Sequence, residues 1–529
     1  MIFKYIKNKK NIVALIIFII LWMFLLGVSG TLNSGYHLTD DHEIVRIKYD
    51  LASQNTLTVA VNWMKRDQFS THRFRPFYFF HRVIETKVFG ANFFAWSIYT
   101  AILAIITSFL LFYFLSLLGF SFWESLLFSL VALIGPQADI WWRLGPNETI
   151  GMFMLAVSLF FLVKYYTSEK NTKAIKILFV IFAILATLSK ESFLLLLPAI
   201  MLLLAYLMKR KENIFWQDSI RRNCISLGVL AGVFAGCILY IKFFIGIGGV
   251  GYAGMVGYAG MVGFAPMKYA KTFLNLSIKS WVGYFIFFQI ISLVILMMLK
   301  KESKNIIIES SKKLFLLSII FLAVVIPQVV LYTKSGFNKR YLLPVMLVYA
   351  FVFIFLLREI RRRSKLILVG MIIVALFFIK GDIKKGFKTA SNFSQEGVAI
   401  NNVFRTVKAN TSKDENFLIV GDPAMYYEWA DSINYYLRYE LDRKNLFIYA
   451  LPRKKSYSNF NKKLIKGFGS IYGDSRYENI NNKSIFDAII LFPRMEKSFL
   501  KKFPKNDILK DKFKRQKFDD FVIYYKTKE

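Results

Sequence analysis

The sequence predicts a mainly α-helical, polytopic membrane protein with about 11 transmembrane helices and a small extracytoplasmic α/β domain at its C-terminus. Hydrophobic residues make up 56% of the 529 residues, and the mean hydropathy is +0.44. The apolar residues gather in recurrent stretches near the roughly 20 residues that a helix needs to cross a bilayer. We therefore predict a transmembrane domain over 1–380, with 31–91 as its first extracytoplasmic loop, and a C-terminal domain over 381–529.

The first apolar stretch, residues 12–28, sets the orientation. It lacks a small-residue cleavage site, so we interpret it as a retained helix rather than a removed signal. Lysines precede it at Lys4, Lys7, Lys9 and Lys10. The positive-inside rule then places the N-terminus in the cytoplasm and the following residues on the extracytoplasmic side of the cell (cytoplasmic) membrane.

A hydropathy window predicts ten further spans in this multi-pass chain. They are expected near 92–117, 122–136, 148–165, 175–188, 193–208, 224–246, 281–299, 314–332, 341–357 and 365–380. Basic residues of alternate connections, such as those at 209–211 and 361–363, then fall on the side of the N-terminus. The segments flanking Ser189 and Ser192 are alternatively one broken helix, but the basic loops downstream argue against this.

The sequence pattern of the C-terminal domain predicts alternating strands and helices. Strands are predicted at 416–420, 446–449, 485–492 and 521–525, and a helix at 426–441. Strand, helix, strand is the pattern of a small α/β domain.

The formal net charge of +36 has two interpretations. It is either a solvated surface or an attraction to membrane lipids with anionic head groups or to an anionic polymer. Nucleic acid is not an expected partner, because much of this charge lies in the domain predicted to be extracytoplasmic.

An acidic cluster, Asp40, Asp41, His42 and Glu43, follows the first span by about ten residues. A carboxylate at this place is suited to act as a general base. Soluble nucleotide sugars are not available on the extracytoplasmic side, so chemistry there needs a substrate carried in the lipid.

Other charged residues stand at the predicted outer ends of spans, where ionisable groups often mark a site. The candidate substrate-binding residues are Arg73, Arg75, Arg143, Glu148, Lys190, Glu191, Lys339, Arg340 and Tyr341. Carboxylates and cations on one face suit group transfer from a phosphate-linked lipid, since a carboxylate can accept the proton of an incoming hydroxyl while Arg and Lys hold the phosphate.

These motifs resemble the membrane-embedded glycosyltransferases of the GT-C fold, which use polyprenyl-phosphate sugars. The resemblance covers about 380 residues. It lies in Asp40-Asp41 after the first helix, the Arg-containing motif Arg73 to Pro76, the Gly-Pro-x-Glu motif Gly145 to Glu148, Ser189 to Glu191, and Arg340 to Pro344.

The resemblance implies an inverting transfer in which Asp40, or its rival Asp41, activates the acceptor. By the same analogy Arg73, Arg75, Lys190 and Arg340 contact the donor phosphate, and Glu148 or Glu191 holds the sugar or an arginine. Some members of the family bind a divalent metal. The resemblance therefore leaves a divalent metal open as a cofactor, with Asp40, Asp41, His42 and Glu43 as its candidate ligands.

The predicted function is therefore a membrane glycosyltransferase that moves a hexosyl or pentosyl group from a polyprenyl-phosphate donor to a cell-envelope glycan or lipid acceptor. The alternative is a transporter or flippase of a lipid-linked solute. That class predicts repeated halves and sites near the midplane of the membrane. The sequence has neither repeated halves nor charges centred in its spans.

Overall fold

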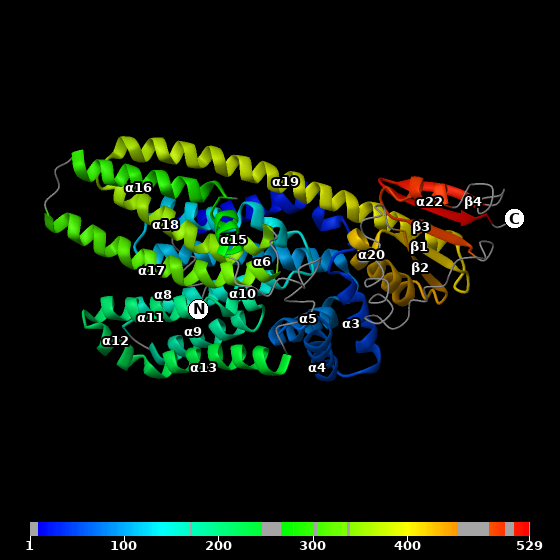
Figure 1. Ribbon diagram of the computed structural model, residues 1–529, viewed down its shortest axis with the longest axis horizontal. Helices are drawn as coiled ribbons and strands as arrows, with labels where there is room; N and C mark the ends of the chain where they lie inside the picture. The colour runs from blue at the N-terminus through cyan, green and yellow to red at the C-terminus, as the bar shows by residue number, and fades with distance from the viewer. Residues whose placement is uncertain are drawn as a thin grey trace.

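The computed structural model describes residues 9–169, 172–245, 266–278, 280–299, 304–335, 339–451, 486–502 and 513–527. A long helical bundle carries a small sheet domain at one end (Figure 1). The predicted fold class, a mainly helical polytopic membrane protein with a C-terminal α/β domain, is confirmed.

Nine helices in the described residues are long and apolar enough to cross a membrane. They are α2 (Lys9–Trp22) with η1 (Met23–Val28), α6 (Phe93–Leu117), α8 (Asn147–Thr167), α10 (Glu191–Leu194) with α11 (Leu197–Glu212), α13 (Cys224–Tyr240) with η5 (Ile241–Ile245), α16 (Trp281–Leu299), α17 (Lys304–Ser335), η6 (Lys339–Leu342) with α18 (Leu343–Arg361), and α19 (Lys365–Asn410). The predicted spans at 122–136 and 175–188 are the shorter helices α7 (Phe122–Leu133) and α9 (Thr172–Thr187).

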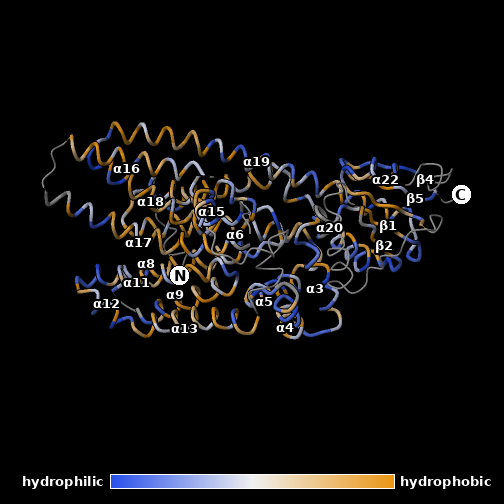
Figure 2. The backbone as a smooth tube through the Cα atoms, viewed as in Figure 1, coloured by the Kyte–Doolittle hydropathy of each residue, from blue (hydrophilic) through white to orange (hydrophobic). Residues whose placement is uncertain are grey.

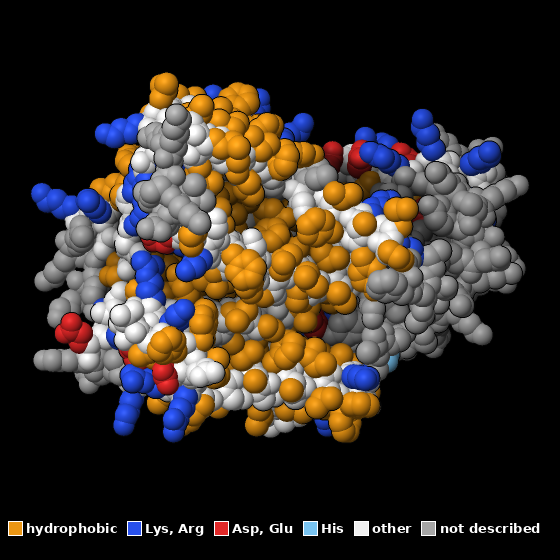
Figure 3. Space-filling view, turned by 60° about the vertical axis from the view of Figure 1, so that its left-hand side comes forward, with side chains coloured by type: hydrophobic (Ala, Val, Ile, Leu, Met, Phe, Trp, Pro, Cys, Tyr) orange, Lys and Arg blue, Asp and Glu red, His pale blue; other side chains and the backbone are white. Residues whose placement is uncertain are grey.

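The centre of the bundle is a continuous apolar core. Helix α8 packs between α6 and α9, and α18 packs against α7, α16 and α17. The outer helices α13, α16 and α19 leave many Ile, Leu and Phe side chains exposed. Figure 2 shows hydrophobic residues along much of these helices, and Figure 3 shows a broad band of hydrophobic side chains across the face of the molecule in view. Such a band is the surface that a lipid bilayer covers.

The connections gather at the two ends of the bundle. Helix α12 (Trp216–Arg222) and the turn between α18 and α19 lie at the end away from the sheet (Figure 1). The predicted loop 31–91 lies near the sheet and is mostly helical. Its elements are η2 (Thr31–Asn33), α3 (His42–Ser53), α4 (Thr56–Arg66), η3 (Asp67–Thr71) and α5 (Pro76–Phe89). The side of the membrane that each end faces stays a prediction from the positive-inside rule.

Helix α19 joins the bundle to the sheet domain. It runs without interruption over 46 residues, so the predicted domain boundary at residue 380 falls within it. The Ser364 side chain caps its start by accepting a hydrogen bond from the Ile367 N–H. At about 1.5 Å per residue the helix is roughly 70 Å long, longer than the hydrocarbon core of a bilayer.

The sheet has the strand order β2-β1-β3-β5-β4. Its strands are β1 (Phe417–Gly421), β2 (Leu446–Ala450), β3 (Ala488–Leu491), β4 (Phe513–Phe518) and β5 (Phe521–Lys526). Strand β1 pairs in parallel with β2 and β3, and β5 pairs in antiparallel with β3 and β4. The sequence did not predict β4, because this edge strand holds four consecutive polar residues and lacks a buried face.

The predicted helix at 426–441 corresponds to α20 (Pro423–Tyr435) and its π-helical continuation η7 (Tyr436–Glu440). A short helix, α22 (Glu496–Lys502), follows β3. Tyr36, Leu38 and Val45 of the segment 31–91 belong to the same apolar cluster as the strands of the sheet. The C-terminal domain is therefore packed directly onto the segment that leads to Asp40.

Candidate active site at the turn before α3

The segment before Asp40 is held between α19 and α20. The Asn401 side-chain amide donates to the carbonyl oxygens of Ser34 and Tyr36 at 3.1 and 3.0 Å. The Tyr36 hydroxyl donates to the Ser432 carbonyl at 2.8 Å. These contacts fix the position of the turn that follows.

Asp40 itself has a left-handed backbone, with φ at 69°. Aspartate is one of the few residues that tolerate this conformation, and such strain is typical of functional sites. Gly145 lies against it so closely that a Cβ atom on Gly145 would overlap the Cβ of Asp40. The turn at Asp40 and the loop before α8 are therefore packed as one unit.

The Asp40 side chain is a partly exposed carboxylate. Its Oδ2 lies 3.3 Å from Nη1 of Arg340, and 26% of the side chain is exposed. Burial opposes its ionisation, but the guanidinium groups of Arg340 and Arg143 outweigh burial and hold the pKa of Asp40 below its ordinary value. Asp40 is therefore ionised at neutral pH, which is the state that a general base needs.

Asp41 is in the opposite situation, although it is the next residue. It is fully buried, and its Oδ2 accepts a hydrogen bond from the His37 N–H at 2.9 Å. Within the described residues Oδ1 has no hydrogen-bond partner. Burial raises the pKa of Asp41 to about 8. A neutral carboxyl is a poor proton acceptor, and this one is hydrogen-bonded within the turn.

The other two members of the acidic cluster point elsewhere. Nδ1 of His42 lies 4.0 Å from Glu428, and burial lowers the pKa of His42 to about 4. The Glu43 carboxylate lies 2.6 Å from the Tyr78 hydroxyl, and burial raises its pKa.

No group of three or more His, Cys, Asp or Glu side chains in the described ranges is placed to hold a metal ion. The residues Asp40 to Glu43, as they are arranged, do not form a ligand set.

Four of the predicted substrate-binding residues meet at the N-terminal end of α8. Nζ of Lys190 is hydrogen-bonded to Oε1 of Glu148, and Nε of Arg340 lies 3.6 Å from the same oxygen. The Lys190 ammonium also sits 4.4 Å above the Tyr341 ring. Through Arg340 this cationic cluster is connected to Asp40. A buried carboxylate shared by two cations keeps both in place.

The remaining candidates are less directly connected. Arg75 forms two hydrogen bonds with Asp67, at 2.9 and 2.6 Å. A bidentate pair of this kind occupies most of the guanidinium. The Glu191 carboxylate accepts a hydrogen bond from the Phe74 N–H at 3.1 Å. Both residues hold the chain around Arg73 in position.

Arg73 lies within electrostatic range of Tyr341. The Arg143 guanidinium covers the Phe393 ring at 5.4 Å and lies 4.0 Å from Asp139. Lys339 begins η6, and its side chain is outside what the structure describes.

Two carboxyl groups on α20 lie at this site and were not predicted from the sequence. Oε1 of Glu428 accepts a hydrogen bond from the Asp40 N–H at 2.7 Å, and burial raises the pKa of Glu428 to about 8. Asp431, one turn further, is fully buried. Neither of its carboxyl oxygens has a hydrogen-bond partner in the described part of the chain. The spacing of three residues places both on one helix face, but nothing local indicates that this face meets Asp40.

Arg82 was also missed. It is buried on α5, donates to the Leu144 carbonyl at 2.6 Å and lies 4.5 Å from the centre of the Trp96 ring. It therefore holds the loop that leads to Gly145 in position.

No protein-family model and no curated protein matches the chain. Among solved structures it is similar to ArnT from Cupriavidus metallidurans in the apo state, at 11% identity and a TM-score of 0.49, over 96% of this chain and 97% of that one. The same protein bound to undecaprenyl phosphate matches at 11% identity and a TM-score of 0.47, over 97% of each chain. Because both TM-scores lie below 0.5, we base the functional proposal on the side chains of this chain.

Proposed function

We propose that the protein is a membrane glycosyltransferase that transfers a hexosyl or pentosyl group from a polyprenyl-phosphate donor to a hydroxyl of a cell-envelope glycan or lipid. The single observation that carries the proposal is the position of the ionised Asp40, 3.3 Å from Arg340. Arg340 in turn belongs to the cationic cluster around Glu148. A base and a phosphate-binding group thus lie side by side.

The transfer is a single displacement. The acceptor hydroxyl donates its proton to the Asp40 carboxylate while its oxygen attacks the anomeric carbon of the donor sugar. The bond from that carbon to the phosphate oxygen breaks, and its electron pair stays on the polyprenyl phosphate that leaves. Attack from the side opposite the leaving group inverts the configuration at the anomeric carbon.

The cations stabilise the leaving phosphate. Arg340 and Lys190 lie together on the Glu148 carboxylate, and Arg73 lies within electrostatic range of the neighbouring Tyr341. These cations are placed to stabilise the negative charge that develops on the phosphate. Arginine suits this role because its planar fork matches phosphate oxygens.

The lipid carrier follows from the predicted orientation. The site lies at the end of the bundle that also holds α3 to α5 and the sheet domain (Figure 1). The positive-inside rule assigns this end to the extracytoplasmic side of the cytoplasmic membrane. A sugar donor reaches that side attached to a membrane lipid rather than to a nucleotide.

The proposal is tested with the purified protein in lipid vesicles and a panel of radiolabelled polyprenyl-phosphate sugars. Asp40→Asn keeps the left-handed backbone, which asparagine tolerates, and removes only the base. We expect transfer or donor hydrolysis to fall by about 10²- to 10⁴-fold. Asp41→Asn, the matched control, should retain most of the activity, because Asp41 is already neutral at neutral pH.

Equal activity in wild type and Asp40→Asn would remove Asp40 from catalysis. A folded wild-type protein that turns over no donor would contradict the enzyme. In that case, movement of a fluorescent polyprenyl-phosphate sugar across the same vesicles would support the transporter of a lipid-linked solute.

A further inference from the structure

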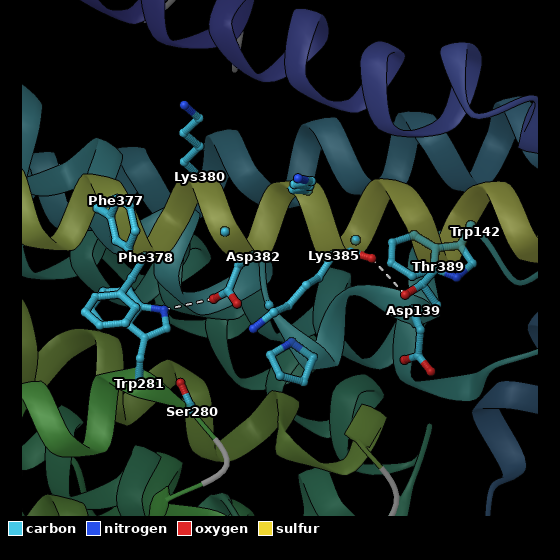
Figure 4. Close-up of a pocket in the computed structure, with 15 residues that line it drawn as sticks. Asp139, Trp142, Ser280, Trp281, Phe377, Phe378, Lys380, Asp382, Lys385 and Thr389 are labelled. Carbon is cyan, nitrogen blue, oxygen red and sulfur yellow. Dashed lines mark hydrogen bonds between the residues drawn. The ribbon is translucent and has the colours of Figure 1, made fainter.

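A cavity of about 590 Å³ lies beside the candidate active site, between η4 (Pro136–Trp141), the start of α16 and the middle of α19. Figure 4 shows Trp281 and Phe378 on one side of it and Asp139 and Trp142 on the other. Lys190 and Arg340, the cations proposed for the donor, do not line it. The cavity is therefore a separate binding space.

The wall of this cavity carries three lysines and two aspartates. The lysines are Lys380, Lys384 and Lys385, of which Lys380 points away from Trp281 and Asp382 (Figure 4). Each of the two acidic residues in the wall already has an interaction partner. Asp382 accepts a hydrogen bond from the Trp281 indole at 2.8 Å, and Asp139 lies 4.0 Å from Arg143. The cavity therefore favours an anionic group such as a phosphate.

An apolar groove continues from the cavity along α16 and α19. The groove has a volume of about 690 Å³ and shares Trp281 and Phe378 with the cavity. It extends along α19 as far as Ile367, which is roughly 16 Å of helix at 1.5 Å per residue. Its lining is aromatic and aliphatic, and the polar side-chain groups in it are the Tyr284 hydroxyl and the Trp281 indole N–H, which donates to Asp382. A space of this shape suits a hydrocarbon chain.

We propose that the cavity and the groove together bind one phosphate-bearing lipid, with the phosphate among the lysines and the chain between α16 and α19. We assign this lipid as the acceptor of the sugar transfer, which rests on the proposed function. A soluble sugar phosphate would use the cationic end and leave the groove unfilled, so the continuity of the two spaces favours an amphiphile. Trp142 and Asp139 place the head group next to Arg143, whose charge acts on Asp40.

The cationic end is tested by binding of radiolabelled phosphatidic acid to the full-length protein in phosphatidylcholine nanodiscs. We expect the double variant Lys384→Ala/Lys385→Ala to bind it about tenfold more weakly. Lys388→Ala is the matched control, because Lys388 lies on the same helix and outside the cavity wall. Binding that falls equally in the control would overturn the assignment.

The groove is tested with Gly370→Trp. A Cβ atom on Gly370 meets no atom within 4 Å, so the indole fills the groove without displacing the backbone. We expect weaker binding of phosphatidic acid, whereas Leu366→Trp, at a position 83% exposed and outside the groove, should bind like the wild type. Soluble glycerol 3-phosphate that displaces phosphatidic acid as effectively as a second lipid does would overturn the role of the groove.

The lipid site and the proposed function fail in distinguishable ways. In the lysine variant we expect donor hydrolysis to persist while transfer to a phosphate-bearing lipid acceptor, at acceptor concentrations below saturation, falls by about tenfold. Equal binding of phosphatidic acid by wild type and by both sets of variants would overturn the lipid site, whatever the transfer assay gives. Selective binding by a wild type that turns over no donor would retain the lipid site and overturn the glycosyltransferase and the acceptor assignment.

Discussion

Asp40 and Asp41 are neighbours in the chain and carry the same side chain, but their surroundings give them different protonation states. Asp40 is partly exposed and faces Arg340, so it stays ionised. Asp41 points into the protein, where it has one backbone donor and no cation within hydrogen-bond distance among the described residues. Separated pKa values in one site favour different roles for two carboxyl groups, and in the proposed mechanism Asp40 is the base and Asp41 supports the turn.

The raised pKa of Asp41 predicts a dependence of stability on pH. In the unfolded chain this carboxyl titrates near about 4, and in the folded protein at about 8. The folded state therefore binds a proton that the unfolded state loses between these pH values. The stability contributed is full below about pH 4 and is lost as the pH rises through about 8.

We therefore expect the thermal stability of the wild type in detergent to fall as the pH rises from about 4 to about 8. Asp41→Asn, which imitates the protonated form, should flatten part of this fall. The part of the fall that remains in this variant is expected from Glu428, whose pKa is also raised to about 8. Asp442→Asn, at an exposed position, is the control. Identical slopes for wild type and Asp41→Asn would contradict the prediction.

Gly145 is a second residue of the candidate site, and the structure leaves no room there for a larger side chain. Gly145→Ala adds a Cβ that overlaps the Cβ of Asp40, and an overpacked position of this kind costs about 1–3 kcal/mol. We expect Gly145→Ala to lose transfer activity even at temperatures where the variant is still folded, because the displaced atom belongs to the proposed base. Gly232→Ala, where the new Cβ meets no atom within 4 Å, should leave both unchanged.

At the scale of elements, α20 is the part of the C-terminal domain that reaches the site. Its Glu428 accepts the Asp40 N–H and thereby helps to hold the left-handed turn. Tyr36 and the Ser432 carbonyl provide a second attachment between the same two elements. We infer that the sheet domain positions the base rather than acting as an independent module.

Glu428→Ala removes the acceptor for the Asp40 N–H, while Glu428→Gln keeps it. We expect kcat to fall by about tenfold in the alanine variant, with a smaller change in KM, and most of the rate to return in the glutamine variant. Steady-state transfer assays at saturating donor measure this difference. A glutamine variant as slow as the alanine variant would show that the charge of Glu428, and not its hydrogen bond, is what matters.

At the scale of the whole molecule, the proposed chemistry depends on which side of the membrane the sheet domain occupies. Lys413 lies in this domain with its side chain 65% exposed, and Arg222 lies at the opposite end with 61% exposed. In a Cys224→Ser/Cys237→Ser background, we expect Lys413→Cys to react with a membrane-impermeant maleimide in intact cells. Arg222→Cys should react only after the cells are opened, and the reverse pattern would contradict the predicted topology.

The membrane class, the positions of most spans and four of the five strands were predictable from the sequence. They depend on local composition and periodicity, such as the apolar run of α6 or the buried pattern of β1. The grouping of Glu148, Lys190, Arg340 and Tyr341 was also expected, because charged residues at span ends share one face of the membrane. The predicted orientation rests on charge counts alone.

The sequence by itself determined that this protein is a membrane-embedded helical bundle with an acidic turn after its first span. Only the tertiary structure decided that Asp40 rather than Asp41 faces the cations. It also placed Glu428 and Asp431 behind that turn, and Trp281 and Phe378 where a lysine-lined cavity opens into a groove. The physical reason is that protonation state and cavity shape depend on groups hundreds of residues apart, whose contacts leave no local pattern in the chain.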